Sequence, residues 1–230
     1  MMQSYKRIVQ AGFIATMLGS AGVVLAQAVD PLKPAPTQES KAVDASGPSQ
    51  LIESSANTLL SGIDKRRDEF RKDPTGLYEL VANTLLPHFD TPYAAQLVLG
   101  KHWRNASVEQ RKRFVEAFYQ SLLYTYGDAM IDFTGDRLKV FPTKVTPTDE
   151  RATVRTEIKR SNGTKVPVSY SLRKVDGQWK AWDVVIEGIS YVRSYREDYG
   201  AQVDKQGIDA VIQRLESRAQ AAKAGKVKKT

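Results

Sequence analysis

The spacing of apolar residues changes once along the chain. From Gln50 to Phe133 they recur every three or four positions, as on one face of an α-helix. After Phe133 they alternate with polar residues, as in strands that have one face in water. The order predicts a group of helices followed by an antiparallel sheet. We therefore expect an α+β fold in which helices cover one apolar face of the sheet.

Capping residues divide the first half into four helices. The first begins at Gln50, and the limits of the next two are marked by Asp73 with Pro74, Pro87, Asp90 with Pro92, and Gly100. Ser107 and Gln110 have the spacing of a capping box. They predict that the longest helix starts at Val108 and runs for about 24 residues.

The turn between the first two long strands, 151–160 and 165–174, sets their register. A two-residue turn would place their apolar residues on opposite faces of the sheet. A three-residue loop, Ser161–Gly163, pairs Val154 with Tyr170 and puts both apolar sets on one face. We therefore predict the longer loop, with its glycine in the left-handed conformation.

The next turn, Val175–Gly177, is interpreted in the same way. A three-residue loop there adds three residues to the face of Tyr170, namely Trp182, Val184 and Ile186. Asp183 then points to the opposite face. We expect it to pair with an arginine, for example Arg196, and to hold the last helix in place. The alternative is that Asp183 serves as a catalytic acid.

The chain starts with the pattern of a secretory signal. Lys6 and Arg7 precede the apolar run Ile8–Leu25, and residues 26–28 read Ala-Gln-Ala. The alternative is an uncleaved membrane anchor. We expect a signal peptide at 1–28, a Pro/Ser/Ala-rich linker at 29–49, one domain at 50–217 and a Lys-rich disordered tail at 218–230.

Composition narrows the function classes. The 230 residues are 41% hydrophobic, enough for one sizeable core, and include no cysteine, so no disulfide stabilises the exported domain. The net charge is +8, and removal of Lys6 and Arg7 lowers it by two. Export and the lack of a recognised binding motif argue against nucleic acid, leaving an anionic membrane or an acidic partner.

Catalytic and metal signals are weak. His88 and His102 are the two histidines, and without cysteines or ligand spacing they predict no metal site. No serine lies in a nucleophile-elbow pattern. The bulky residues Tyr126, Tyr170 and Trp182 carry polar tips, which suits either a filled core or the mouth of a ligand cavity. The residue pattern leaves this choice open.

Two motifs are specific. One is Pro87-His88-Phe89-Asp90 followed by Val-Leu-Gly-Lys-His-Trp at 98–103, and the other is Asp183-Val184 to Gly188-Ile189-Ser190 followed by Tyr195-Arg196. In order and spacing they resemble the MlaC family of periplasmic phospholipid carriers, once described as toluene-tolerance proteins. The resemblance extends over about residues 52–215.

This resemblance implies an NTF2-like domain, with N-terminal helices on a curved antiparallel sheet and C-terminal helices, that holds acyl chains between its layers. It implies a periplasmic carrier that moves phospholipid between an outer-membrane lipoprotein complex and an ATP-driven inner-membrane complex with a ring of MCE domains. Such a carrier helps to maintain the lipid asymmetry of the outer membrane. Phospholipid is then cargo, and we expect no cofactor and no catalytic residue.

The predicted faces and this resemblance together suggest the residues that line the lipid site. From the sheet these are Val154, Ile158, Val168, Tyr170, Trp182, Val184 and Ile186. The helical candidates are Phe89, Tyr93, Leu97, Phe118, Leu122, Tyr126 and Tyr191. Two other functions stay open: a periplasmic adaptor with a solid core, or an isomerase or dehydratase of the same fold.

Overall fold

The structure is a computed structural model that describes residues 43–127, 130–131, 138–159 and 162–223. The expected signal peptide and most of the expected linker lie outside these residues. Helix α8 continues to Lys223, beyond the domain limit expected at residue 217. Ala219 on that helix is buried, which gives it a packing reason to extend.

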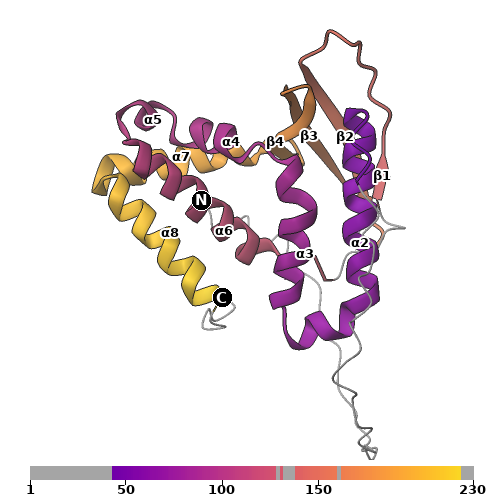
Figure 1. Cartoon of the computed structure of the whole chain (residues 1–230), viewed down its shortest axis with the longest axis horizontal. Helices are drawn as coiled ribbons and strands as arrows, with labels where there is room; N and C mark the ends of the chain where they lie inside the picture. Colours follow the sequence, from indigo (N-terminus) through magenta and orange to yellow (C-terminus); the bar gives the residue numbers. More distant parts are fainter. Residues whose placement is uncertain (1–42, 128–129, 132–137, 160–161, 224–230) are drawn as a thin grey trace, which may run out of the picture. The chain divides into compact units, whose positions relative to one another are not determined.

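The described elements follow the predicted order of helices, sheet and helices (Figure 1). The first helices are α2 (Pro48–Lys72), α3 (Thr75–Leu85), the short 3₁₀ helix η1 (Leu86–His88), α4 (Thr91–Leu99), α5 (Lys101–Asn105) and α6 (Val108–Tyr126). The strands are β1 (Leu138–Val140), β2 (Arg151–Lys159), β3 (Lys165–Val175), β4 (Gln178–Ile186) and β5 (Ile189–Ser190). They form one antiparallel sheet in sequence order, before α7 (Tyr191–Gln206) and α8 (Ile208–Lys223). The α+β prediction is confirmed.

The predicted caps are present at α4 and α6. Asp90 accepts a hydrogen bond from the Tyr93 amide at 3.2 Å. Ser107 and Gln110 form the reciprocal capping box, with distances of 2.9 and 3.1 Å. Gly100 ends α4 with a φ of 53°, a left-handed value that favours glycine. The sequence therefore marked these helix ends correctly.

Two helix predictions need correction. Helix α6 has 19 residues instead of about 24, and it ends at Tyr126 before Gly127, a residue of low helix propensity. The chain also forms a short helix, α5, directly after Gly100. The left-handed glycine reverses the chain there, and one new helical turn begins at once.

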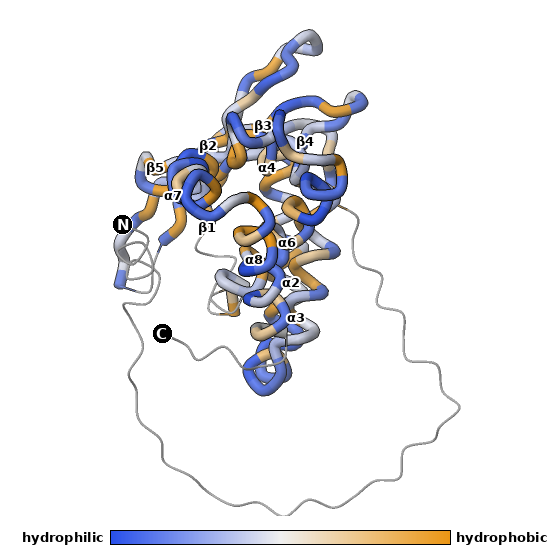
Figure 2. The backbone as a smooth tube through the Cα atoms, turned by 90° about the vertical axis from the view of Figure 1, so that its left-hand side faces the viewer, coloured by the Kyte–Doolittle hydropathy of each residue, from blue (hydrophilic) through white to orange (hydrophobic). Residues whose placement is uncertain are grey.

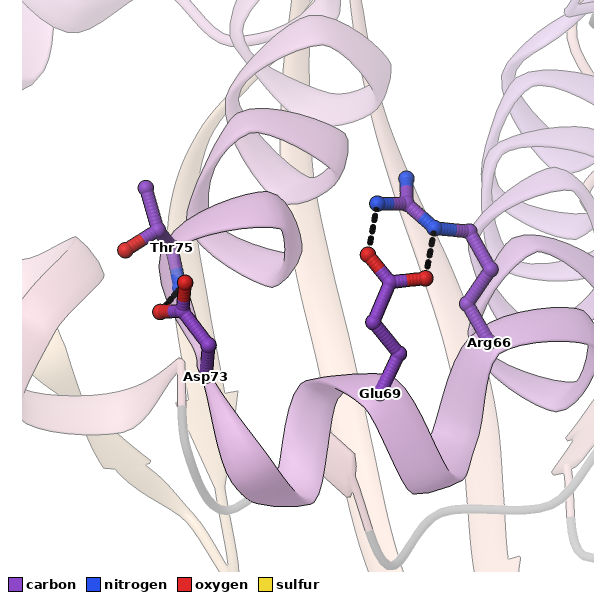
Figure 3. Close-up of polar contacts among 4 residues, drawn as sticks. All are labelled: Arg66, Glu69, Asp73 and Thr75. Carbon is purple, nitrogen blue, oxygen red and sulfur yellow. Dashed lines mark hydrogen bonds and ion pairs between the residues drawn. The ribbon is translucent and has the colours of Figure 1, made fainter. Parts of the chain in front are cut away.

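The connection between α2 and α3 is fixed by local polar contacts (Figure 3). Helix α2 is kinked at Arg66, whose φ of −130° is not helical. The Arg66 guanidinium donates to both carboxylate oxygens of Glu69, at 2.5 and 2.9 Å. Asp73 accepts from the Thr75 amide at 3.0 Å and so caps the start of α3.

Side chains of the sheet alternate between two faces, which we call the inner and the outer face. The inner face carries Val154, Tyr170 and Val184, and the outer face carries Arg151 and Ser171. The pairing of Val154 with Tyr170 confirms the register predicted for the first hairpin. The first two positions of its expected loop lie outside the described residues, and Gly163 has the predicted left-handed φ of 84°.

The second hairpin differs from its prediction. Its turn has two residues, Asp176 and Gly177, with φ values of 51° and 77° as in a type I′ turn. A bulge then shifts the register opposite Ser171 and Leu172. Val184 and Ile186 still reach the inner face because the shorter turn and the bulge compensate.

Trp182 is the exception to this compensation. It is the extra residue of the bulge, so it lies on the outer face instead of the inner face predicted for it. There its ring makes an edge contact with Tyr93, with centroids 5.5 Å apart. Counting alternate residues cannot detect a bulge.

The apolar core consists of three clusters. One joins α2 to the inner face, with Leu51 and Ile52 packed near Val154 and Leu172. A second lies between α2 and α3, and a third joins α4, α6, α7 and α8. In Figure 2 the tube changes repeatedly between apolar and hydrophilic residues along these helices, as amphipathic packing requires.

Asp183 anchors the C-terminal helices, as expected, but through different partners. It accepts hydrogen bonds from the Ser190 hydroxyl at 2.6 Å and from the Val192 amide at 3.0 Å. Within the described part of the chain, no contact between Asp183 and Arg196 is recorded. The first amide groups of a helix have no acceptor within the helix, and a buried carboxylate can accept hydrogen bonds from them. If Asp183 paired with an arginine instead, these amide groups would stay unpaired.

We predict that Asp183→Ala lowers the free energy of unfolding by about 2 kcal/mol, because two buried donors at the start of α7 lose their acceptor. Urea denaturation would measure the change. The control is Glu197→Ala, an exposed position on the same helix. Equal midpoints for the Asp183 variant and the parent protein would contradict the anchoring role.

Candidate functional site

Part of the inner face lies outside the apolar clusters that the described residues form. Val168 pairs with Ile186, and Tyr170 pairs with Val184, across β3 and β4. Val184 and Ile186 keep part of their surface exposed. Neither belongs to any of the three clusters that the described residues form. Apolar surface held beside a core but not filled by it is what a binding site for an apolar ligand offers.

Helices α6 and α7 carry a row of packed aromatic rings. We call it the aromatic ladder, formed by Phe114, Phe118 and Tyr126 of α6 and Tyr191, Tyr195 and Tyr199 of α7. Phe118 packs edge-on against Tyr195 and Tyr199, with centroids 5.2 and 5.8 Å away. Its buried end is Phe114, with no exposed surface. Phe114, Phe118 and Tyr199 belong to the cluster of the C-terminal helices, and Tyr195 packs against it.

The other end of the ladder is polar. The hydroxyls of Tyr126 and Tyr195 are hydrogen-bonded at 2.9 Å and so join α6 to α7. Tyr191 stands beside both rings, with centroids 6.1 and 6.2 Å away. Buried tyrosine hydroxyls need such partners, and here they find them in each other.

Burial raises the pKa of several tyrosines further above neutral pH. It raises the pKa of Tyr195 and of Tyr191, and it raises the pKa of Tyr199 to about 12 with a contribution from the Asp198 carboxylate. On the sheet, burial raises the pKa of Tyr170, and a hydrogen bond with Thr156 opposes this shift in part. Hydroxyls with raised pKa values do not ionise near neutral pH, so they act as hydrogen-bonding groups.

Most of the sequence-predicted lining residues fall into two groups in the structure. The inner face holds Val154, Ile158, Val168, Tyr170, Val184 and Ile186. Phe118, Leu122, Tyr126 and Tyr191 lie in or beside the aromatic ladder. Phe89 packs against the cluster between α2 and the sheet. Phe118 is only 6% exposed and enclosed by other rings, whereas Val184 and Ile186 are open.

Three predicted residues lie apart from this set. Tyr93 and Trp182 contact each other on the outer face, near Arg173, whose guanidinium stands 4.0 Å from the centroid of the Tyr93 ring. Leu97 is half-buried on α4 and belongs to none of the clusters of described residues. The bulge places Trp182, and with it the contact to Tyr93, on the outer face.

Arg196 has a positional role. Gly100 approaches it so closely that a side-chain carbon at Gly100 would lie 2.9 Å from the Arg196 Nε atom. Arg196 therefore packs α7 against the end of α4. Gly100 belongs to the first sequence motif and Arg196 to the second, so the fold brings the two motifs into contact.

Sequence reasoning missed part of the ladder. Phe114 and Tyr199 were not among the predicted site residues, and Tyr195 was noted only as a bulky side chain. The available signal was the spacing of Tyr191, Tyr195 and Tyr199, which are four residues apart and so share one helix face.

The histidines lie in ordinary surroundings. Burial and the nearby Lys180 lower the pKa of His88. His102 Nε2 lies 3.4 Å from an Asp204 carboxylate oxygen. Among the described residues, no three potential metal ligands come together.

Within the described part of the chain, no helix has both the length and the apolar character needed to cross a bilayer. The described elements define an α+β protein with N-terminal helices, a five-stranded antiparallel sheet and C-terminal helices. The comparison with known families is specific. The chain belongs to the MlaC family, because the family model described as MlaC protein matches residues 53–217.

Comparison with individual proteins supports the same family. The chain is 27% identical over 181 residues to the intermembrane phospholipid transport system binding protein MlaC of Haemophilus influenzae, covering 77% of this chain and 85% of that protein. It is 27% identical over 168 residues to the toluene tolerance protein ttg2D of Pseudomonas putida, covering 73% and 78%. Family membership places the chain among lipid-binding transport proteins and not among enzymes, as the sequence indicated.

A solved structure has the same fold. The phospholipid-binding protein of Ralstonia solanacearum, determined in complex with a phospholipid, matches with a TM-score of 0.67 and 22% identity. The match covers 75% of this chain and 96% of that protein. It confirms the predicted arrangement of N-terminal helices, antiparallel sheet and C-terminal helices.

The raised pKa of Tyr199 has a consequence for stability. Unfolded tyrosine ionises near pH 10, so the neutral buried hydroxyl contributes stability below pH 10 that is lost as the pH rises from 10 to about 12. We predict that Tyr199→Phe makes the free energy of unfolding fall less steeply in this range, by up to about 1.4 kcal/mol per pH unit. Urea denaturation between pH 9 and pH 11 measures how the free energy of unfolding changes with pH. Equal slopes in the variant and the parent protein would contradict the raised pKa of Tyr199.

Proposed function

We propose that this protein is a periplasmic phospholipid carrier whose cargo lies on the inner face of the sheet. The observation that carries the proposal is the uncovered apolar surface at Val184 and Ile186, beside an otherwise closed core. The relatives' names support it, since one is a phospholipid transport binding protein and a structural relative was determined with a phospholipid.

The proposed lining is the set predicted from the sequence without Tyr93, Leu97 and Trp182, and its centre is the inner face. Val168, Tyr170, Val184 and Ile186 would form its centre, because they are paired across β3 and β4. Tyr126 and Tyr191, at the polar end of the aromatic ladder, would stand at its border. The polar head group would remain toward water, where its charge is solvated.

Passive carriage follows from the energetics of acyl chains. Each buried CH₂ group contributes about 0.8 kcal/mol, so two long chains gain roughly 20 kcal/mol or more in a sheltered site. Leaving a bilayer costs a similar amount, because the chains lose equivalent apolar surroundings. The net free energy of transfer is then close to zero. Handover at docking sites would decide the direction of transport, with energy supplied by another protein.

The proposed partners are those implied by the family resemblance. The carrier would exchange phospholipid with an outer-membrane lipoprotein complex and with an inner-membrane ATP-driven complex that presents a ring of MCE domains. The signal pattern at residues 1–28 supports delivery to the periplasm between them. Through this exchange the protein would help to maintain the lipid asymmetry of the outer membrane.

Native mass spectrometry of the mature protein, purified from the periplasm without detergent, tests the function directly. We expect a phospholipid adduct with about one lipid per protein, identified after solvent extraction. A bare polypeptide mass, with no vesicle-to-vesicle lipid transfer by the purified protein, would refute the carrier and favour an adaptor with a solid core.

The location of the cargo is tested by adding bulk to each face. Val168→Trp and Val184→Trp should reduce bound phospholipid several-fold, because an indole would occupy the space of the acyl chains. Ser169→Trp adds the same side chain to the outer face of β3 and should leave the lipid content unchanged. Circular dichroism checks that each variant is folded. Full lipid content in both inner-face variants would contradict the proposed lining.

A further inference from the structure

The outer face of the sheet places like charges directly opposite one another. Arg151 faces Arg173 across β2 and β3, and Arg173 faces Lys180 across β3 and β4. We call these three residues the cationic row. Directly opposed like charges destabilise a sheet. Asp90 neutralises one member, since its carboxylate accepts from Arg173 Nε at 2.6 Å.

The same face carries further positive charge. Lys139, Arg155, Lys159 and Lys165 bring its cations to seven, against two strand carboxylates, Glu157 and Asp183. Glu157 pairs with Lys165 at 3.0 Å, and Asp183 is occupied by the start of α7. The excess of positive charge is thus not balanced within the described sheet. Like charges that face each other across strands without enough carboxylates to neutralise them depart from the usual pattern of sheets. Such departures are typical of functional surfaces.

The β2 part of this surface is open to solvent, whereas the start of α4 contacts Arg173 and the start of α7 covers Asp183. Arg151, Thr153 and Arg155 are exposed, and the helix that packs on β2 does so on the inner face. Between the strands lies a shallow groove of about 260 Å³, bordered by Arg151, Thr153, Ser171 and Trp182. A guanidinium and two hydroxyls offer donors at its rim. Such a groove fits an oxygen acceptor on a small side chain, and a carboxylate best.

We propose that the outer face of the sheet is a docking surface for an acidic protein surface, with the groove beside Arg151 receiving an Asp or Glu side chain. This inference rests on the proposed function, because a carrier must dock in order to exchange its cargo. The cargo itself is assigned to the inner face, so its phosphate is not the anion that the cationic row would bind.

The chemistry of the outer face favours a protein partner over a bilayer surface. Binding in a membrane interface combines cations with apolar side chains that insert among the lipids. The outer face offers few such groups, because Trp182 is partly buried against Tyr93. Among the described residues, the large apolar side chain with strong exposure is that of Val108, which is 81% exposed and lies on α6 and not on the sheet. Charge and hydroxyls without apolar anchors suit electrostatic docking to a protein.

The test is charge reversal of two exposed outer-face residues, Arg151→Glu with Arg155→Glu, in the mature protein. Association with the purified inner-membrane complex and with the outer-membrane complex is measured by biolayer interferometry at about 50 and 300 mM salt. We expect the association rate with at least one complex to fall about tenfold or more at low salt, with a weaker salt dependence. The matched control is Arg104→Glu with Lys112→Glu, which changes the charge equally at exposed helical positions.

Unchanged association of the outer-face variant overturns the proposal, as does an equal loss in the control, which would make net charge the cause. Failure of the parent protein to bind either complex also overturns it. A third arm uses vesicles that contain anionic phospholipid. Binding of the parent protein to them, lost in the outer-face variant while association with both complexes is kept, replaces the proposal with a membrane surface.

Bound lipid, measured by native mass spectrometry in all three proteins, separates this proposal from the proposed function. Normal lipid content with lost docking supports both. An empty parent protein refutes the carrier, whatever the docking result.

Discussion

The alternation of side chains along each β-strand is the constraint on which the rest of this structure depends. The same strands β2, β3 and β4 present valines and a tyrosine to one face and arginines, lysines and serines to the other. A register shift of one residue would exchange the two sets and bury the charges. The hairpin turns therefore determine both where an apolar ligand can lie and where a charged partner can approach. The compensation between the two-residue turn at Asp176 and the later bulge keeps Val184 and Ile186 on the apolar side.

The aromatic side chains after β4 pack two helices together, although their number in the sequence suggested the lining of a ligand cavity. Tyr195 and Tyr199 fill the contact between α6 and α7, with Phe118 enclosed between them. Phenylalanine could provide this packing, but the hydroxyl bond between Tyr126 and Tyr195 also fixes the two helices at the open end of the ladder. The closed part of the core thus fixes α6 and α7 relative to each other. The proposed ligand surface comes mainly from aliphatic residues of the sheet.

The sequence predicted the fold where local chemistry determines structure. The capping box at Ser107, the cap at Asp90 and the left-handed Gly163 follow from side-chain and backbone preferences of a few neighbouring residues. The register of the first hairpin followed because only one loop length unites its apolar residues. Trp182 was misplaced, since a bulge depends on packing against Tyr93 and on strand twist, which no local pattern encodes. The partner of Asp183 was missed for a related reason: the amide of Val192 carries no side-chain signal.

A carrier of lipid has to bind its partners weakly as well as specifically. A large apolar interface would hold it in place, because burial of apolar area favours long-lived complexes. Cations on a flat sheet accelerate encounter and set orientation, while adding little to the lifetime of the complex when they remain at a solvated rim. The opposed charges of Arg151, Arg173 and Lys180 are unfavourable in the free protein and are relieved when an acidic surface approaches. Because the apolar inner face lies on the other side of the same strands, docking at the outer face can proceed without covering the region through which the acyl chains would leave.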